Sequence, residues 1–165
     1  MNRCRTKLKL IEITRVSATD IPAIEAIAHA CSLATWTGSD YMNELSRSDS
    51  LFFKAGCDSG SCLGFILARI IPAVRAENGE DAEIYNIGVM PDKQGTGIGT
   101  MLMNAVRDEC RNRSVRVVWL EVRRGNSQGI SFYSKHNFDV VAVRRSFYRD
   151  PVEDAIVMRS KLYNS

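Results

Sequence analysis

The sequence predicts a mixed α/β fold in which helices cover both faces of one central β-sheet. Two stretches carry this prediction. Between Glu83 and Arg111, an alternating segment rich in branched residues runs through a glycine-rich turn into helical periodicity. Between Val115 and Val122 the chain is nearly all apolar, as expected of a strand buried on both faces in a parallel arrangement. The complete predicted order of elements is β-α-α-β-β-β-α-β-α-β-β.

The composition is that of an ordinary soluble globular protein. At 165 residues the chain has a common single-domain size, and we expect one domain over residues 1–165. A net charge of +3 fits an anionic ligand or an RNA-associated partner and specifies neither; no direct nucleic-acid binding is expected. No apolar stretch reaches membrane-spanning length, and Glu12 and Arg15 interrupt the apolar run near the start. We therefore expect neither a membrane partner nor a signal peptide.

The five cysteines, at positions 4, 31, 57, 62 and 110, are odd in number and lack the spacing of a disulfide framework. This indicates a reducing, cytoplasmic location. Cys57 and Cys62 have no second cysteine or histidine pair nearby, so we expect no metal site. Cys31 and His29 have no visible partner at catalytic spacing, and we expect a core or surface position for both.

The first third of the chain predicts one strand and two helices. Lys9–Val16 alternates as a strand does. Ser17–Asp20 then supplies helix caps. The buried face of the first helix consists of Ile24, Ile27, Ala28 and Cys31. A capping-box pattern of Thr37 with Asp40 opens a second, short helix over Ser39–Ser46.

Three strands are predicted in the middle of the chain. Leu51–Cys57 and Ser61–Ile71 flank Asp58-Ser59-Gly60, which is a hairpin signal. A polar loop over Pro72–Glu80 leads to the third strand, at Glu83–Val89.

The Glu83–Val89 strand ends at Pro91, which cannot donate a backbone hydrogen bond to a sheet. Gly95, Gly97 and Gly99 follow. Helical spacing then begins in the apolar residues Ile98, Met101, Leu102, Ala105 and Val106. Such a turn leaves the first amides of the helix unpaired at its positive end, and glycine lets another group approach the backbone closely. The pattern predicts a phosphate or pyrophosphate site.

The last third predicts one helix and two strands after the strand at Val115–Val122. Asn126 is suited to cap the helix, and Asn137 stands where a left-handed residue ends it. The two strands are predicted over Asp139–Arg145 and Asp154–Leu162, with Ser146–Glu153 as their connection.

The spacing of the glycines separates the kinds of phosphate ligand. A dinucleotide site requires G-x-G-x-x-G and a P-loop requires a lysine after its last glycine, and neither occurs here. The chain has Q-x-x-G-x-G instead, at Gln94, Gly97 and Gly99. This closely resembles the acetyl-CoA signature of the GNAT family of N-acetyltransferases, whose order of elements also matches. The resemblance implies acetyl-CoA as cosubstrate and the following contact residues: Ile87, Gly88, Val89, Gly95, Thr96, Gly97, Ile98, Gly99, Thr100 and Asn126.

Glu121 and Tyr133 are the candidates for chemistry. A carboxylate near the end of an apolar strand faces solvent, pairs with a cation or works in a cleft, and Arg123 or Arg124 could be its structural partner. A tyrosine on an apolar helix face is more often core than catalyst. Together they fit acetyl transfer from a thioester to an amine, with the carboxylate accepting the amine proton and the hydroxyl protonating the thiolate. Backbone N–H groups of Ile87–Val89 would stabilise the oxyanion.

The segment W-L-E-V-R-x-x-N, followed by F-Y, is similar to the RimI type of GNAT enzyme, which acetylates the N-terminal alanine of a ribosomal protein. This resemblance implies Glu121 as general base, Tyr133 as general acid and Asn126 as a CoA contact. Arg144–Met158 also resembles this branch. Related enzymes hold the substrate peptide with a tyrosine-bearing loop there, which implies Tyr148 as a substrate-binding residue.

Three functions remain open on the sequence. The first is acetylation of a protein N-terminus, with a ribosomal protein as candidate partner, because an α-amine of pKa about 7.7–8.0 needs only a modest base. The second is acetylation of a small amine such as a polyamine or an aminoglycoside, and the arginines at 144, 145 and 149 argue mildly against it. The third is a non-catalytic acetyl-CoA-binding regulatory module, which intact Glu121 and Tyr133 disfavour.

Phe147 departs from the family pattern, because a second tyrosine is common there.

Overall fold

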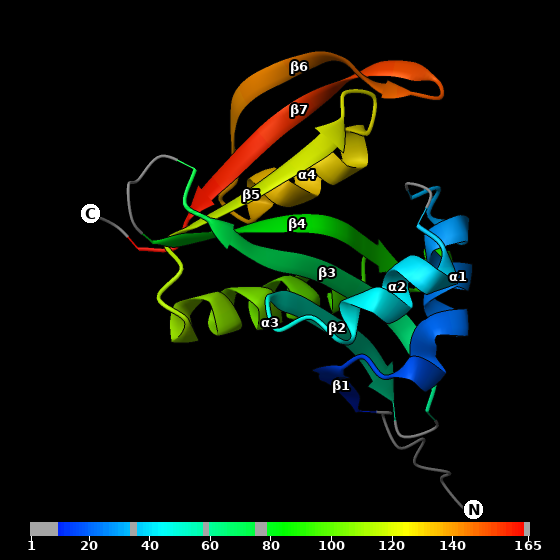
Figure 1. Cartoon of the computed structure of the whole chain (residues 1–165). Helices are drawn as coiled ribbons and strands as arrows, with labels where there is room; N and C mark the ends of the chain where they lie inside the picture. Colours follow the sequence, from blue (N-terminus) through cyan, green and yellow to red (C-terminus); the bar gives the residue numbers. More distant parts are fainter. Residues whose placement is uncertain (1–9, 34–35, 58–59, 75–78, 164–165) are drawn as a thin grey trace, which may run out of the picture.

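The computed structural model describes residues 10–33, 36–57, 60–74 and 79–163. Seven strands form one mixed sheet in the order β1-β2-β3-β4-β5-β7-β6 (Figure 1). The strands are β1 (Ile11–Arg15), β2 (Ser50–Cys57), β3 (Cys62–Pro72), β4 (Glu80–Val89), β5 (Val117–Arg123), β6 (Asp139–Arg149) and β7 (Val152–Lys161). The helices are α1 (Ile21–Ala30), α2 (Gly38–Glu44), α3 (Ile98–Asn112) and α4 (Ser127–Lys135), with 3-10 turns at Ala18–Asp20 and Pro91–Lys93. Cys4, Lys9 of the predicted first strand, Asp58 and Ser59 of the predicted turn, and residues 75–78 of the predicted loop lie outside the described residues.

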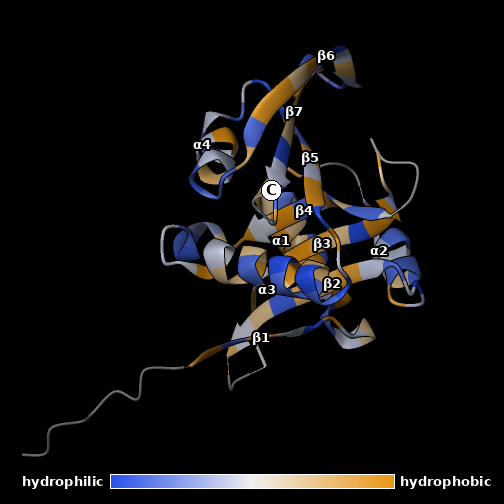
Figure 2. Ribbon diagram, turned by 90° about the vertical axis from the view of Figure 1, so that its left-hand side faces the viewer, coloured by the Kyte–Doolittle hydropathy of each residue, from blue (hydrophilic) through white to orange (hydrophobic). Residues whose placement is uncertain are grey.

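Helices cover both faces of the sheet, which confirms the predicted fold class. Side chains alternate along β3, so Phe65 and Leu67 enter the core under α1 and α2, whereas Ile66 and Ala68 enter the core under α3. Figure 2 shows α3 and α4 on one side of the sheet and α2 on the other. We call these two sides the α1–α2 face and the α3–α4 face.

The predicted caps at Thr37, Asn126 and Asn137 form as expected, whereas Asp20 of the predicted Ser17–Asp20 cap makes no side-chain cap bond to α1. Thr37 and Asp40 make the reciprocal bonds of a capping box at the start of α2. Asn126 accepts a hydrogen bond from the Gly129 amide at the start of α4 (2.8 Å). Asn137 has a positive φ of 59° directly after that helix.

The C-terminal hairpin differs from the prediction. β6 extends to Arg149 and β7 begins at Val152, so the predicted connection over Ser146–Glu153 is wrong. Tyr148 lies in β6 and pairs with Glu153 of β7 instead of occupying a loop. Two register shifts along β6 interrupt the strict alternation by which a strand is recognised in a sequence.

Two further boundaries also differ. The predicted polar loop over Pro72–Glu80 is shorter, because the end of β3 at Pro72 pairs with the start of β4 at Glu80. β5 begins at Val117 and is fully buried on one face only, whereas we expected burial on both. It is parallel to β4 over three residue pairs but antiparallel to β7 along its whole length. The apolar run therefore identified a central strand but not its neighbours.

A β-bulge in β4 opens the sheet. Leu67 pairs with Asn86 and the next residue of β3, Ala68, pairs with Ile84, which leaves Tyr85 as the extra residue. The parallel pairing of β4 with β5 ends at Ile84 and Leu120. Beyond this point the two strands diverge toward their carboxyl ends (Figure 1). The divergence places the functional site between β4 and β5.

Candidate active site

A cavity of about 520 Å³ lies between the diverging ends of β4 and β5. Its walls come from these strands, the glycine-rich turn, α4, the end of α1 and one residue of β6. The cavity brings together most of the residues predicted from sequence: Ile87, Gly88, Val89, Gly95, Gly97, Gly99, Thr100, Glu121, Asn126, Tyr133 and Tyr148. Thr96 and Ile98 do not line it. Ile98 is 1% exposed within the core, and the Thr96 hydroxyl donates to the Lys93 carbonyl (2.6 Å).

The glycine-rich turn presents bare backbone to the cavity. Gly95 and Gly97 have φ values of 75° and 93°, a region that side chains other than glycine rarely adopt. Gly97 is the N-cap of α3, and no side chain caps the helix. Within the described part of the chain, no amide from Gly95 to Thr100 donates to a protein acceptor. The turn is therefore suited to an anion.

Gly99 has a different role from the other two glycines. A Cβ at this position would lie 3.1 Å from the Phe132 ring, so the missing side chain permits close packing of α3 against α4. The Gln128 side chain of α4 also donates to Gln94 of the turn (3.2 Å). These contacts hold the turn and α4 together on one side of the cavity.

The free edge of β4 presents backbone amides to the cavity. The Val89 carbonyl accepts hydrogen bonds from Cys31 Sγ (3.2 Å) and Gln94 Nε2 (3.1 Å), whereas the Met90 amide donates to Leu63 of β3 (2.9 Å). Successive residues of a strand direct their backbone groups to opposite sides. The N–H groups of Val89 and of Ile87, two residues earlier, therefore point away from β3 and toward the cavity.

Glu121 is paired with a cation that we did not predict. Its carboxylate, 19% exposed, forms an ion pair with Arg144 of β6. Arg123 contacts Glu153 (3.1 Å) and Arg124 contacts Asp154 (3.3 Å), so neither predicted partner holds Glu121. Arg144 reaches Glu121 across β7, and such a contact depends on the register of three strands.

Tyr133 and Tyr148 bring two hydroxyl groups to the same end of the cavity. Tyr133 packs against the rings of Phe132 and Phe138, with centroids 5.5 and 5.9 Å away. Burial raises the pKa of Tyr133 well above its usual range, and the nearby Tyr148 raises it further. Burial also raises the pKa of Tyr148, and the charge of Glu121 adds to that shift. Both hydroxyls are therefore protonated donors at neutral pH.

Several cavity residues were not among the predicted contacts. Cys31, expected in a core or surface position, lies at the end of α1 beside Val89. Asn86 and Tyr85 line the cavity because of the bulge, which leaves no mark in the hydrophobic pattern. Phe132, next to Tyr133, could have been found from its place in the F-Y pair.

Two other features of the described residues bear on function. They contain no cluster of three or more histidine, cysteine or acidic side chains that could hold a metal ion. None of the helices in this part of the chain combines the length and apolar character needed to span a membrane.

Comparison with known proteins assigns the chain to a family. The profile of the acetyltransferase (GNAT) family matches residues 21–138. A ribosomal protein bS18-alanine N-acetyltransferase of Escherichia coli K12 is 31% identical over 157 residues, which cover 88% of this chain and 94% of the relative. The crystal structure of the Escherichia coli ribosomal-protein-S18-alanine N-acetyltransferase superimposes with a TM-score of 0.79 at 27% identity, covering 94% of this chain and 96% of the other.

The same fold occurs in a more distant structure, Arabidopsis thaliana NAA60 in complex with acetyl-CoA. It has a TM-score of 0.83 at 20% identity and covers 92% of this chain and 98% of the other. The glycine-rich turn without a side-chain cap, the divergence of β4 from β5 and these similarities all indicate the same family. The chain belongs to the acetyltransferase (GNAT) family and is an N-acetyltransferase.

Proposed function

We propose that the protein transfers an acetyl group from acetyl-CoA to the α-amino group of a protein N-terminus, with an alanine-initiated ribosomal protein as the first candidate. One observation carries the proposal. A single cavity joins the uncapped turn at Gly95–Thr100 to a carboxylate, Glu121, and a protonated hydroxyl, Tyr133. The similarity to the Escherichia coli enzyme over 94% of its length supports the choice of acceptor.

The turn fits the pyrophosphate of acetyl-CoA. Among the residues that the structure describes, its amides have no acceptor and a Cβ built on Gly95 or Gly97 meets no heavy atom within 4 Å, so the space above the backbone is open. Asn126 uses its side-chain oxygen to cap α4, which leaves its side-chain nitrogen available for a CoA contact. Acetyl-CoA supplies the activated acyl group as a thioester, and the free edge of β4 at Ile87–Val89 lines the same cavity as the turn and the carboxylate.

Three groups that line the cavity carry out the proposed chemistry. Glu121 accepts the proton that the amine loses as its nitrogen bonds to the acetyl carbon, directly or through a water. The amides of Ile87 and Val89 donate to the oxyanion that develops on the acetyl oxygen. The carbon–sulfur bond then breaks, and Tyr133 gives its proton to the departing thiolate. Direct transfer of this kind needs no metal.

Tyr148 is our candidate for holding the acceptor peptide. It is half-buried in β6, and the Arg123 guanidinium lies 4.1 Å from the centre of its ring. Arg123 is itself held by Glu153 and by the carbonyls of Asp150 and Pro151. These contacts fix the ring at the rim of the cavity, where its hydroxyl can donate to a peptide carbonyl. The neighbouring Phe147 is 43% exposed and provides no hydroxyl.

The reaction takes place, in this proposal, in the cytoplasm. Cys31, Cys62 and Cys110 are free thiols, which persist in a reducing compartment. Newly made ribosomal proteins are available there as acceptors.

The test measures CoA release with three acceptors. These are an alanine-initiated peptide with a free N-terminus, the same peptide blocked at its N-terminus but containing lysine, and a mixture of polyamines and aminoglycosides. Turnover confined to the first acceptor is the expected result. Turnover confined to the last would contradict the protein acceptor and retain the acetyltransferase chemistry.

A further inference from the structure

Asn86 is a buried residue in the wall of the cavity, and its side-chain nitrogen is unpaired within the described part of the chain. It is 5% exposed, it lines the cavity, and its Nδ2 has no hydrogen-bond partner among the described residues. Leaving a buried amide unsatisfied destabilises a folded protein, and native structures satisfy nearly all such groups. Because Nδ2 has almost no exposed surface in the empty cavity, a bound molecule supplies the missing acceptor only when the side chain turns toward it.

The bulge in β4 sets the direction of the Asn86 side chain. Directly paired residues of antiparallel strands project to the same face of a sheet. Asn86 is paired with Leu67, which belongs to the core under α1 and α2. Gly88, two residues later, confirms this face, because a Cβ there would lie 3.1 Å from Ile27 of α1. Asn86 therefore projects to the α1–α2 face.

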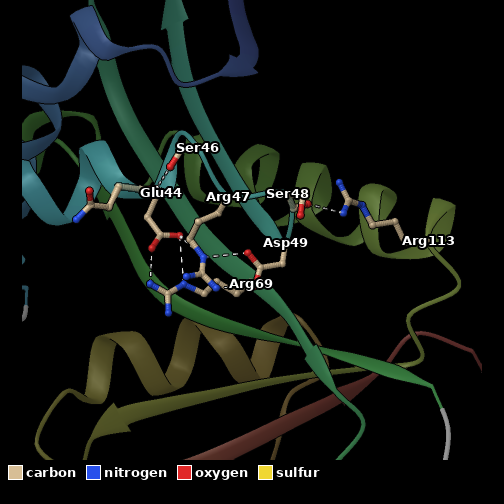
Figure 3. Close-up of polar contacts among 8 residues, drawn as sticks. Glu44, Ser46, Arg47, Ser48, Asp49, Arg69 and Arg113 are labelled. Carbon is tan, nitrogen blue, oxygen red and sulfur yellow. Dashed lines mark hydrogen bonds and ion pairs between the residues drawn. The ribbon is translucent and has the colours of Figure 1, made fainter.

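Contacts on the same face hold the bulge in place. The Arg69 guanidinium of β3 lies 4.7 Å from the centre of the Tyr85 ring and 5.5 Å from that of Trp36. Figure 3 shows Arg69 reaching the carboxylate of Glu44 in α2, and this ion-paired glutamate is 2% exposed. Since α2 and β3 together fix Arg69, they also fix Tyr85 and the direction of the adjacent Asn86.

Glu121 projects to the same face as Asn86. Leu120 belongs to the core under α3, and side chains alternate along a strand, so Glu121 points to the opposite side. The glycine-rich turn opens α3 on the α3–α4 face. The amide and the carboxylate thus stand together on one face, and the turn stands toward the other. Both residues line the same cavity, so an acceptor that approaches Glu121 from this face also meets the wall that carries Asn86.

We propose that Asn86 donates a hydrogen bond from Nδ2 to the carbonyl oxygen of the acceptor's first residue and so selects α-amines over amines without an adjacent carbonyl. This inference rests on the proposed function. In an extended residue the nitrogen and the carbonyl oxygen point to the same side, so an amine at Glu121 presents this oxygen to the same wall. A polyamine or a lysine side chain has a methylene group there and leaves the amide unsatisfied, which a site of this kind rejects.

The test combines two acceptors with two proteins. One acceptor is an alanine-initiated peptide; the other carries a trans-alkene in place of its first peptide bond, which keeps the shape and lacks the carbonyl oxygen. For the wild type, kcat/KM should fall by about 10- to 100-fold from the peptide to the alkene. For Asn86→Leu, the peptide should already show that loss, the alkene should show no further loss, and the KM for acetyl-CoA should not change.

Thermal unfolding separates recognition from a structural role. Asn86→Leu removes an unsatisfied buried amide, so its Tm should rise by about 2–4 °C, whereas loss of a structural contact would lower it. Asn104→Leu, at an exposed position of α3 outside the cavity, is the matched control and should keep the acceptor preference. Asn86→Ala serves if the leucine variant does not fold.

The outcomes distinguish the inference from the proposed function. A peptide kcat/KM that is unchanged in both Asn86 variants would overturn the Asn86 assignment, as would a loss seen only in the KM for acetyl-CoA. A wild type that binds acetyl-CoA but acetylates no free peptide N-terminus would overturn the proposed function instead.

Discussion

The two sides of the cavity are built from different kinds of group. On the α3–α4 face, the turn from Gly95 to Thr100 offers backbone amides whose direction follows from three glycines and a helix start. On the α1–α2 face, the contacts are side chains, and Glu121 and Asn86 come from strands that no longer pair with each other. The difference teaches that a backbone site is local in sequence, whereas a side-chain site depends on strand register.

Gly97→Val should disable the backbone part of the site, the glycine-rich turn, and have the largest effect of the substitutions. The valine must adopt a φ of 93°, and its side chain fills the space that a pyrophosphate would occupy. We expect acetyl-CoA binding to fall below detection in calorimetry.

Gly60→Val is the matched control for this variant. Gly60 has a φ of 73° and also has open space around it, but it lies outside the cavity. The control should lose stability to a similar extent and still bind acetyl-CoA. Normal binding by Gly97→Val would remove the argument for a phosphate site at the turn.

Glu121→Gln should disable the side-chain part of the site by removing the general base, and it should have the second largest effect. Loss of a general base lowers turnover by about 10²- to 10⁴-fold. The loss should be greatest at low pH, where the amine is mostly protonated, and acetyl-CoA affinity should be retained. Steady-state rates across pH test this, with Glu12→Gln on β1 as an exposed carboxylate outside the cavity. A pH–rate profile identical to that of the wild type would count against Glu121 as the base.

The difference between the two sides also explains what could be predicted from the sequence. The strand, the glycine turn and α3 are consecutive, and the hydrophobic period changes at the turn, so all three were predicted correctly. Glu121 and Tyr133 were chosen as candidates from their motifs, and both line the cavity. Arg144 was missed as the partner of Glu121, because the contact crosses β7 and β6 carries two register shifts that no periodicity reveals. Asn86 was missed for the same reason, since one bulge decides its face.

Tyr133→Phe tests the general acid and should have the third largest effect. Burial raises the pKa of Tyr133, so the hydroxyl stays protonated over the working pH range and can donate to the thiolate. Removing it should lower kcat by about 10²-fold, at the lower end of general acid–base effects. The KM for acetyl-CoA should change little. Tyr163→Phe, outside the cavity, is the control, and a kcat that falls equally in both variants would contradict the assignment.

Arg144→Gln should have the smallest effect, because it leaves the carboxylate in place and removes only the cation that orients it. The Arg144 side chain is 57% exposed, and ion pairs of this kind contribute about 0.2–1 kcal/mol. We therefore expect kcat/KM to fall by no more than about fivefold. Arg124→Gln, which breaks the exposed pair with Asp154 without touching Glu121, should have no effect on turnover. A loss in Arg144→Gln as large as that in Glu121→Gln would show that the side-chain wall acts as a coupled unit, in which the carboxylate accepts a proton only while β6 holds it.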